Sequence, residues 1–187
     1  MKVVVALVAF GLLTGCGKPS AEESFRAGEQ AQAQAEQSLG NSPQSVDSLF
    51  RTAIGHYEQV VENHPDDPLA ENALFRIAEL HNNGTRNFHE AIATYRRFFS
   101  AYPESPQAPV SLFMIAFLNN NELHDLNAAS IAYREFLSRY PNHELASSAK
   151  GELDYLGKSP EQIIEQQVAL QKEGKGSAAS GGKQENQ

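Results

Sequence analysis

A segment that recurs three times constrains the fold of this chain more than any other feature of its sequence. The copies read YEQVVENHP, YRRFFSAYP and YREFLSRYP and begin at positions 57, 95 and 133, so the period is 38 residues. A fixed period of this length is typical of repeat architectures. One helical turn before each first tyrosine there is a small residue on the same helix face: Ala53, Ala91 and Ala129. The repeat therefore predicts a helix that ends at a proline.

Composition limits the classes of protein to which a chain with this repeat can belong. The 187 residues are 41% hydrophobic and 20% charged, which suits one modest core, and the formal net charge is -8. We expect no nucleic-acid partner, because an acidic chain is repelled by phosphate backbones. A single cysteine excludes an internal disulfide, and no apolar run is long enough for a permanent transmembrane helix.

The N-terminal residues read as a targeting signal. Lys2 precedes an uncharged apolar run that is too short to remain in a bilayer as a spanning helix. The run ends in LTGC at 13–16, which resembles the lipobox of bacterial lipoproteins. This resemblance implies cleavage before Cys16 and a lipid such as palmitate on that cysteine. Because Gly17 follows instead of Asp, it also implies attachment to the periplasmic face of the outer membrane. The alternative is an unmodified thiol after an ordinary signal.

Caps and breakers divide the rest of the chain into helices. Ser20 has a capping-box partner in Glu23, and an Asp-Pro or Ser-Pro pair begins at positions 67, 105 and 159, where it favours a helix start. The expected helices are 21–38, 45–64, 68–81, 87–102, 106–118, 126–140, 145–156 and 161–170. The expected organisation is a signal peptide at 1–15, a lipidated tether at 16–20, a repeat domain at 21–171 and a disordered tail at 172–187.

The helix pairs resemble the tetratricopeptide repeat. The first helices of the pairs share a small residue at equivalent positions, Ala78 and Ala116, and the second helices share another, Ala91 and Ala129. In each second helix an aromatic residue follows one turn later, and a proline follows the end of the helix. The period is longer than the usual value of about 34 residues. Larger residues also replace a second small residue and imply wider helix packing: Val60, Phe98 and Phe136. The resemblance implies an all-α, right-handed helical solenoid of about three helix pairs with a C-terminal capping helix.

The same repeats are similar to those of two groups of bacterial envelope proteins, the BamD-like barrel-assembly lipoproteins and the Tol-Pal coordinators. This similarity implies a non-catalytic scaffold that binds other envelope proteins during assembly of outer-membrane β-barrel proteins. A coordinator of the Tol-Pal or peptidoglycan machinery is the alternative. Such coordinators usually lack a lipobox and begin with a coiled coil, whereas residues 21–38 lack heptads.

The sequence shows no constellation that would carry catalysis. The six histidines form neither a zinc-protease pair nor a pair with a cysteine, and no nucleophile motif or phosphate loop is present. We expect no enzyme activity, no metal, no cofactor and no small-molecule substrate. A less favoured alternative is a ligand bound in a groove by asparagines: Asn82, Asn83, Asn120 and Asn121.

The first helices of each pair are the expected partner surface. By resemblance they line a groove that includes Asn72, Phe75, Glu79, Val110, Phe113, Phe117, Asn120 and Asn121. Spacing by itself places Val110, Met114 and Phe117 on one stripe, whereas the stripe one period earlier is polar: Asn72, Arg76 and Glu79. The apolar stripe needs a cover. The helix at 161–170 is the favoured cover, and a partner segment is the alternative.

Overall fold

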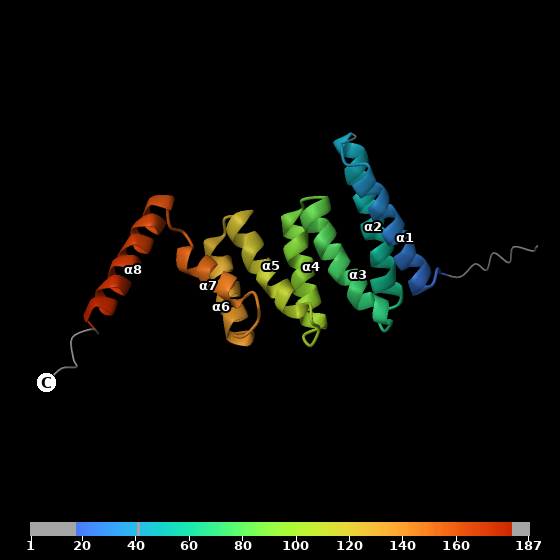
Figure 1. Ribbon diagram of the computed structural model, residues 1–187. Coiled ribbons are helices and arrows are strands. Elements are labelled where there is room, and N and C mark those ends of the chain that lie inside the picture. The colour runs from blue at the N-terminus through green and yellow to red at the C-terminus, as the bar shows by residue number, and fades with distance from the viewer. Residues whose placement is uncertain (1–17, 41, 181–187) are drawn as a thin grey trace, which may run out of the picture. The chain divides into compact units, whose positions relative to one another are not determined.

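The computed structural model describes residues 18–40 and 42–180, with side chains for 18–40, 42–169 and 171. This part of the chain forms helices and no strand, which confirms the predicted all-α class (Figure 1). The predicted signal peptide, Cys16 and the end of the predicted tail lie outside the described residues. Contacts divide the chain into two compact units, 1–73 and 74–187.

The first unit contains a pair of helices, α1 (Ala21–Gln37) and α2 (Pro43–Asn63). The predicted capping box starts α1, because the Glu23 N–H donates to Ser20 Oγ at 3.1 Å and the Ser20 N–H donates to Glu23 Oε2 at 2.8 Å. The helix α2 begins two residues before the expected start at 45. Pro43 explains the difference, since proline fits the first helical turn, where its missing N–H leaves no bond unmade.

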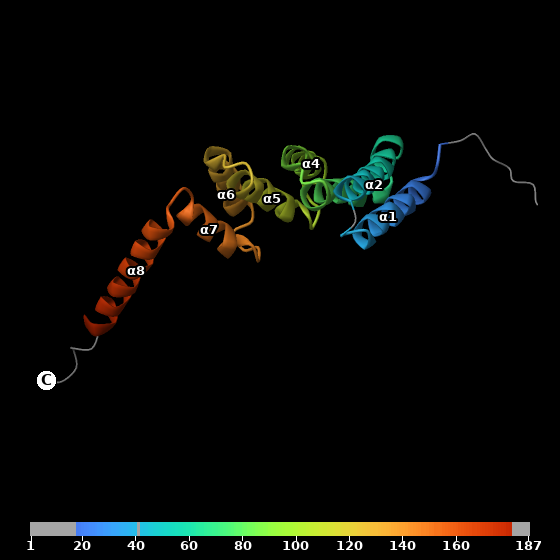
Figure 2. The same ribbon diagram turned by 90° about the horizontal axis from the view of Figure 1, so that it is seen from above.

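The helices α1 and α2 are antiparallel and lie side by side (Figure 1 and Figure 2). The start of α1 meets the end of α2, where Lys18 Nζ donates to Asn63 Oδ1 at 2.6 Å and His64 Nε2 lies 2.8 Å from the Pro19 carbonyl oxygen. Between them, Tyr57 is fully buried, and its ring meets that of Phe25 edge to face with centroids 5.2 Å apart. The first tyrosine of the repeat is therefore a core residue.

The second unit contains the end of α3 (Pro68–Glu79), the π-helix η1 (Leu80–Gly84) and five further helices. These helices are α4 (Phe88–Ala101), α5 (Ala108–Asn121), α6 (Leu126–Arg139), α7 (Ala146–Tyr155) and α8 (Pro160–Ser180). The helix α5 packs against both α4 and α6, and α6 packs against α7. Successive helices therefore form neighbouring pairs, as the period predicts.

The backbone repeats at the interval that the sequence shows. The helices α4 and α6 begin after capping side chains of Asn87 and Asp125, which each accept a hydrogen bond from the N–H three residues on. At their other ends, Tyr102 and Tyr140 have φ of -129° and ψ of 61° and 54°, outside helical geometry as the following proline requires. His64 adopts almost the same angles, -137° and 53°, so it is a structural equivalent of these tyrosines.

Aromatic rings fill the interior of each helix pair in the second unit. The buried face of α6 carries Ala129, Tyr133 and Phe136, and that of α4 carries the equivalent Ala91, Tyr95 and Phe98. Phe75 of α3 meets Tyr95 and Phe98 edge to face at 5.9 and 5.2 Å, and Phe113 of α5 meets Tyr133 and Phe136 in the same way at 5.8 Å each. The large residues at 98 and 136 are thus accommodated by a ring from the facing helix.

Several helix ends differ from the sequence prediction. The helix α5 begins at Ala108 instead of 106, because Ser105 forms a turn in which its side chain accepts from the Gln107 N–H at 3.1 Å. Pro109 then occupies the first turn that was expected for Pro106. The helix α8 starts as predicted, with Ser159 and Gln162 as its capping box, but its backbone runs to Ser180. Its length replaces the first part of the expected disordered tail.

Candidate protein-interaction site

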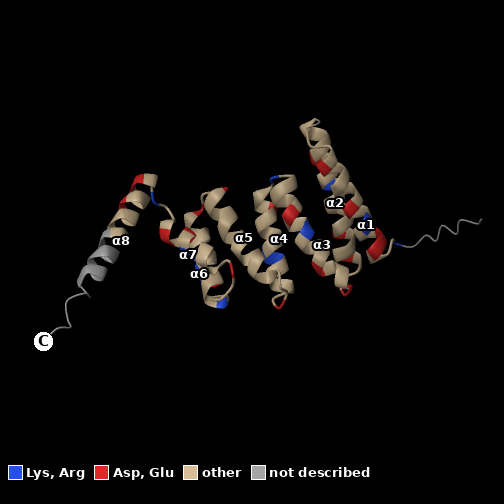
Figure 3. Ribbon diagram, viewed as in Figure 1, with Lys and Arg blue, Asp and Glu red and all other residues tan. Residues whose placement is uncertain are grey.

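The helix α5 is unusual in carrying no charged residue along its length (Figure 3). One side of the helix is buried and holds Leu112, Ile115, Ala116 and Leu118. The opposite side is apolar as well, although its residues are only half-buried: Val110, Phe113, Met114 and Phe117. A helix that is apolar all round is typical of a fully covered position. We call the side formed by Val110, Met114 and Phe117 the α5 stripe.

Ring packing holds the middle of this surface in place. Phe113 and Phe117 stack with an interplanar angle of 20° and centroids 6.2 Å apart. Because Phe113 also meets the buried rings of Tyr133 and Phe136, it is anchored in the core, and Phe117 extends that aromatic cluster toward solvent. Phe117 of the α5 stripe is therefore held in place before any partner binds.

The equivalent surfaces of the neighbouring first helices are polar. On α3, Asn72 is exposed, and Arg76 Nη1 forms an ion pair with Glu79 Oε2 at 3.1 Å. One period after the α5 stripe, α7 carries Ser148, Glu152 and Tyr155. An apolar stripe thus occurs on α5 alone among these three helices.

Phe75, which the groove prediction included, does not line an exposed surface. Its side chain retains 7% of its accessible area and packs against Tyr95 and Phe98. Sequence spacing placed Phe75 and Phe113 at the same position of the repeat, yet Phe113 is half-exposed. We therefore leave Phe75 out of the candidate site and treat it as a packing residue.

The asparagines at the end of α5 have structural partners. Asn120 Nδ2 donates to Glu152 Oε2 of α7 at 3.1 Å, and Asn121 Nδ2 donates to the Phe117 carbonyl oxygen at 3.0 Å. Asn82 is half-buried and Asn83 is exposed. Since Asn120 and Asn121 are engaged in joining and ending helices, the four asparagines do not form a convergent set of free polar groups, and the structure gives the groove-ligand alternative no support.

The expected C-terminal cover of the α5 stripe is not in place. Two large apolar side chains of α8, Ile164 and Val168, remain 60% and 44% exposed. They would be buried if α8 lay along the stripe. The prediction that the helix at 161–170 covers Val110, Met114 and Phe117 is therefore wrong for the described structure, and the partner alternative remains.

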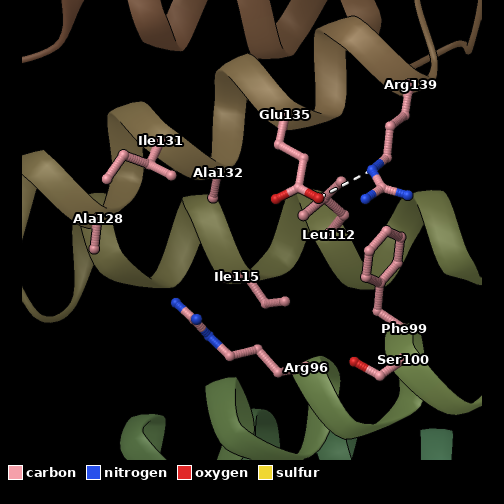
Figure 4. Close-up of a pocket in the computed structure, with 10 residues that line it drawn as sticks. All are labelled: Arg96, Phe99, Ser100, Leu112, Ile115, Ala128, Ile131, Ala132, Glu135 and Arg139. Carbon is pink, nitrogen blue, oxygen red and sulfur yellow. Dashed lines mark ion pairs between the residues drawn. The ribbon is translucent and has the colours of Figure 1, made fainter.

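A second surface feature was missed by the sequence reasoning. A hollow of about 480 Å³ lies between α4 and α6, with α5 as its floor (Figure 4). Its lining is Arg96, Phe99, Ser100, Leu112, Ile115, Ala128, Ile131, Ala132, Glu135 and Arg139. The sequence did carry one signal for this hollow, since the large apolar Ile131 stands at an exposed position where the previous repeat has Ala93.

The buried tyrosines of the core have the properties of packing residues. Burial raises the pKa of the Tyr95 and Tyr133 hydroxyls, and the nearby carboxylates of Glu79 and Glu152 raise it further. Both tyrosines are therefore neutral at physiological pH. Among the described residues, no group of His, Cys, Asp and Glu is arranged to hold a metal ion. Within the same residues, no helix combines the length and the apolar content that crossing a membrane requires.

The helix pairs and their alanine and aromatic packing define an all-α protein of the tetratricopeptide type. Residues 72–105, which span most of α3, η1 and α4, match the profile of the tetratricopeptide repeat family. A comparison with curated proteins found no match to the chain. Tetratricopeptide repeats are protein-interaction modules and are typically non-catalytic. The class of partner for this chain is therefore protein.

Proposed function

We propose that the chain is a lipid-anchored scaffold on the periplasmic face of the bacterial outer membrane, which binds another envelope protein through the α5 stripe. The observation that supports this proposal most strongly is that α5 carries no charged residue while Val110, Met114 and Phe117 on its outer side stay half-exposed. Burying that surface against a partner would release ordered water, at a gain of roughly 25 cal/mol per Å² of apolar area.

The chemistry of the stripe indicates the kind of segment that it binds. Its residues are aliphatic, sulfur-containing and aromatic, and they lie at the i, i+4 and i+7 positions of one helix. An amphipathic helix or an apolar extended segment matches such a surface, because helices present side chains at similar spacing. Met114 adapts to partners of different shape, since its side chain is unbranched and flexible.

The matched test uses equivalent positions in two repeats. Val110→Glu places a charge in the α5 stripe, whereas Asn72→Glu places the same charge at the exposed equivalent position on α3. Both variants would be affinity-purified with their lipid from envelopes, and the co-purifying proteins would be quantified. Loss of a partner from Val110→Glu and its retention by Asn72→Glu would support the proposal. Equal partner recovery from both variants and the unaltered chain would contradict it.

The membrane anchor rests on the LTGC segment before position 17, and it is tested separately. Cys16→Ala removes the thiol to which the lipid would be attached, so the variant is expected to leave the membrane fraction. Fractionation of envelopes into inner membrane, outer membrane and soluble periplasm checks this. A variant that still sediments with the outer membrane would refute anchoring through Cys16.

Assembly of outer-membrane β-barrel proteins is the envelope process that we favour, because the lipobox and the Tyr-Pro repeats occur together in this chain. The alternative is coordination of the Tol-Pal or peptidoglycan machinery. The helix α1 argues for the first assignment, since it packs along α2 and lacks the heptads of an N-terminal coiled coil. The identity of the proteins that depend on Val110 for co-purification decides between them.

A further inference from the structure

The hollow between α4 and α6 combines an apolar floor with an unpaired cation. Leu112 and Ile115 form the floor, and Ile131 stands on the wall with 60% of its side chain exposed. The Arg96 guanidinium makes no hydrogen bond or ion pair with any described residue, although it lines the same hollow (Figure 4).

The other cation of the hollow is already engaged. Arg139 Nε pairs with Glu135 Oε1 at 2.9 Å, and its guanidinium lies 5.1 Å from the centroid of the Phe99 ring. Arg96 is therefore the group at this site that lacks an anionic partner. A ligand that fits the hollow needs an apolar side chain for Ile131 and a carboxylate for Arg96.

The helix α8 presents these two groups together. Ile164 and Val168 lie one turn apart on the same face and are both exposed, and Glu165 lies beside them. The Glu165 carboxylate makes no hydrogen bond or ion pair within the described residues. Glu161, one turn before Glu165, accepts a hydrogen bond from Ser159 Oγ at 2.7 Å and so belongs to the helix cap.

We propose that the hollow between α4 and α6 binds α8 of a second copy of this chain. Ile164 and Val168 of one copy cover Ile131 of the other, and Glu165 pairs with Arg96. Five large apolar side chains are exposed among the described residues: Leu39, Leu126, Ile131, Ile164 and Val168. This contact buries three of them and neutralises two unpaired charges. Within a single copy all three stay exposed, which favours a second copy as the source of the helix.

The contact does not involve the α5 stripe, so it stands or falls independently of the proposed function.

A charge-reversal experiment tests the pairing in the full lipidated chain. Two copies with different affinity tags are co-expressed, extracted with detergent and purified through one tag, and recovery of the other copy is measured. Arg96→Glu in both copies, or Glu165→Arg in both copies, should reduce recovery at least tenfold, because like charges then face each other. A mixture of one Arg96→Glu copy and one Glu165→Arg copy should recover wild-type pairing, since each contact regains opposite charges.

Arg97→Glu is the matched control, because Arg97 is an exposed neighbour on α4 that does not line the hollow. It should leave recovery within twofold of wild type. An equal loss with Arg97→Glu, or full pairing of copies that both carry Arg96→Glu, would overturn the proposal. So would failure of the mixed pair to regain binding.

A second measurement identifies where the helix comes from. Cysteines replacing Ile131 and Val168 are introduced in the lipidated chain, in which the lipid blocks the Cys16 sulfur, and are oxidised in the detergent extract. A disulfide-linked dimer is expected when one copy carries Ile131→Cys and the other carries Val168→Cys. A chain that carries both cysteines and crosslinks only within itself would show that α8 folds back onto its own hollow, which would overturn binding by a second copy.

Discussion

Gly28 of α1 lies directly against the ring of Tyr57 in α2, and a Cβ atom built on Gly28 would stand 2.8 Å from Tyr57 Cε1. Real Cβ contacts are essentially never this short, so the absence of a side chain at Gly28 allows the two helices to approach at the buried tyrosine. The first tyrosine of the repeat is thus covered by glycine and by Phe25, whereas the other two are covered by Phe75 and Phe113.

This contact predicts opposite effects of the same substitution at two helical glycines. Gly28→Ala should lower the free energy of unfolding by about 1–3 kcal/mol, because the extra methyl overpacks a rigid site. Gly55→Ala in α2 has no atom within 4 Å of its new Cβ and should raise the free energy of unfolding by about 0.5–1 kcal/mol through helix propensity. Urea unfolding followed by circular dichroism measures both, and equal effects would contradict the close packing at Tyr57.

The capping box of α1 predicts a local loss of stability. Ser20→Ala removes the oxygen that accepts from the Glu23 N–H and should cost about 0.5–2 kcal/mol. Because the cap is at the end of the helix, amide exchange in the first turn of α1 should accelerate more than exchange in α6. Unchanged protection of the first turn would show that the cap contributes nothing.

The same capping box predicts a dependence on pH. The Ser20 N–H holds the pKa of Glu23 below its ordinary value of 4.5, and the Ser20 hydroxyl lowers it further. Since the folded pKa is depressed, this stabilisation is present above pH 4.5 and is lost as the pH falls through the folded pKa. Glu23→Gln should remove this part of the acid sensitivity. Melting temperatures of the unaltered chain and of Glu23→Gln between pH 7 and pH 3 check this prediction. Parallel curves for the two proteins would show that protonation of Glu23 does not affect stability.

Tyr133 carries a buried hydroxyl that makes no hydrogen bond within the described part of the chain. Removing that hydroxyl should be neutral or stabilising by up to about 1 kcal/mol, because the ring stays in place and an unsatisfied polar atom is lost. Tyr57→Phe is the control, since the Tyr57 hydroxyl donates to Gln32 Oε1 at 3.3 Å and its loss should cost about 0.5–1.5 kcal/mol. A larger loss with Tyr133→Phe than with Tyr57→Phe would show that the Tyr133 hydroxyl is satisfied.

The two kinds of phenylalanine in the first helices should separate stability from binding. Phe75→Ala empties a buried site and should cost about 3–5 kcal/mol in unfolding free energy. Phe117→Ala removes a half-exposed ring, so the cost should be clearly smaller while partner recovery falls. Thermal unfolding and affinity purification of both variants measure this. A Phe117→Ala protein as unstable as Phe75→Ala would assign Phe117 to the core.

Much of the candidate site was readable from the sequence, and the rest depended on burial. The α5 stripe follows from spacing, because Val110, Met114 and Phe117 are three and four residues apart and helical periodicity is local. Spacing did not separate Phe75 from Phe113, which occupy equivalent positions but differ in exposure. It also did not reveal the hollow, whose lining comes from three helices that the sequence separates.

The sequence by itself determined the order and most boundaries of the α-helices in the described part of the chain, because capping side chains, prolines and alanine spacing act within a few residues of the backbone that they constrain. Asn87, Asp125 and the Tyr-Pro pairs illustrate this, since each acts on the helix next to it. Only the tertiary structure decided which apolar residues are covered. Burial depends on neighbours that are distant in the sequence. The exposure of Ile164 and Val168, the burial of Phe75 and the lack of an ion-pair partner for Arg96 among the described residues therefore emerged once the helices were packed.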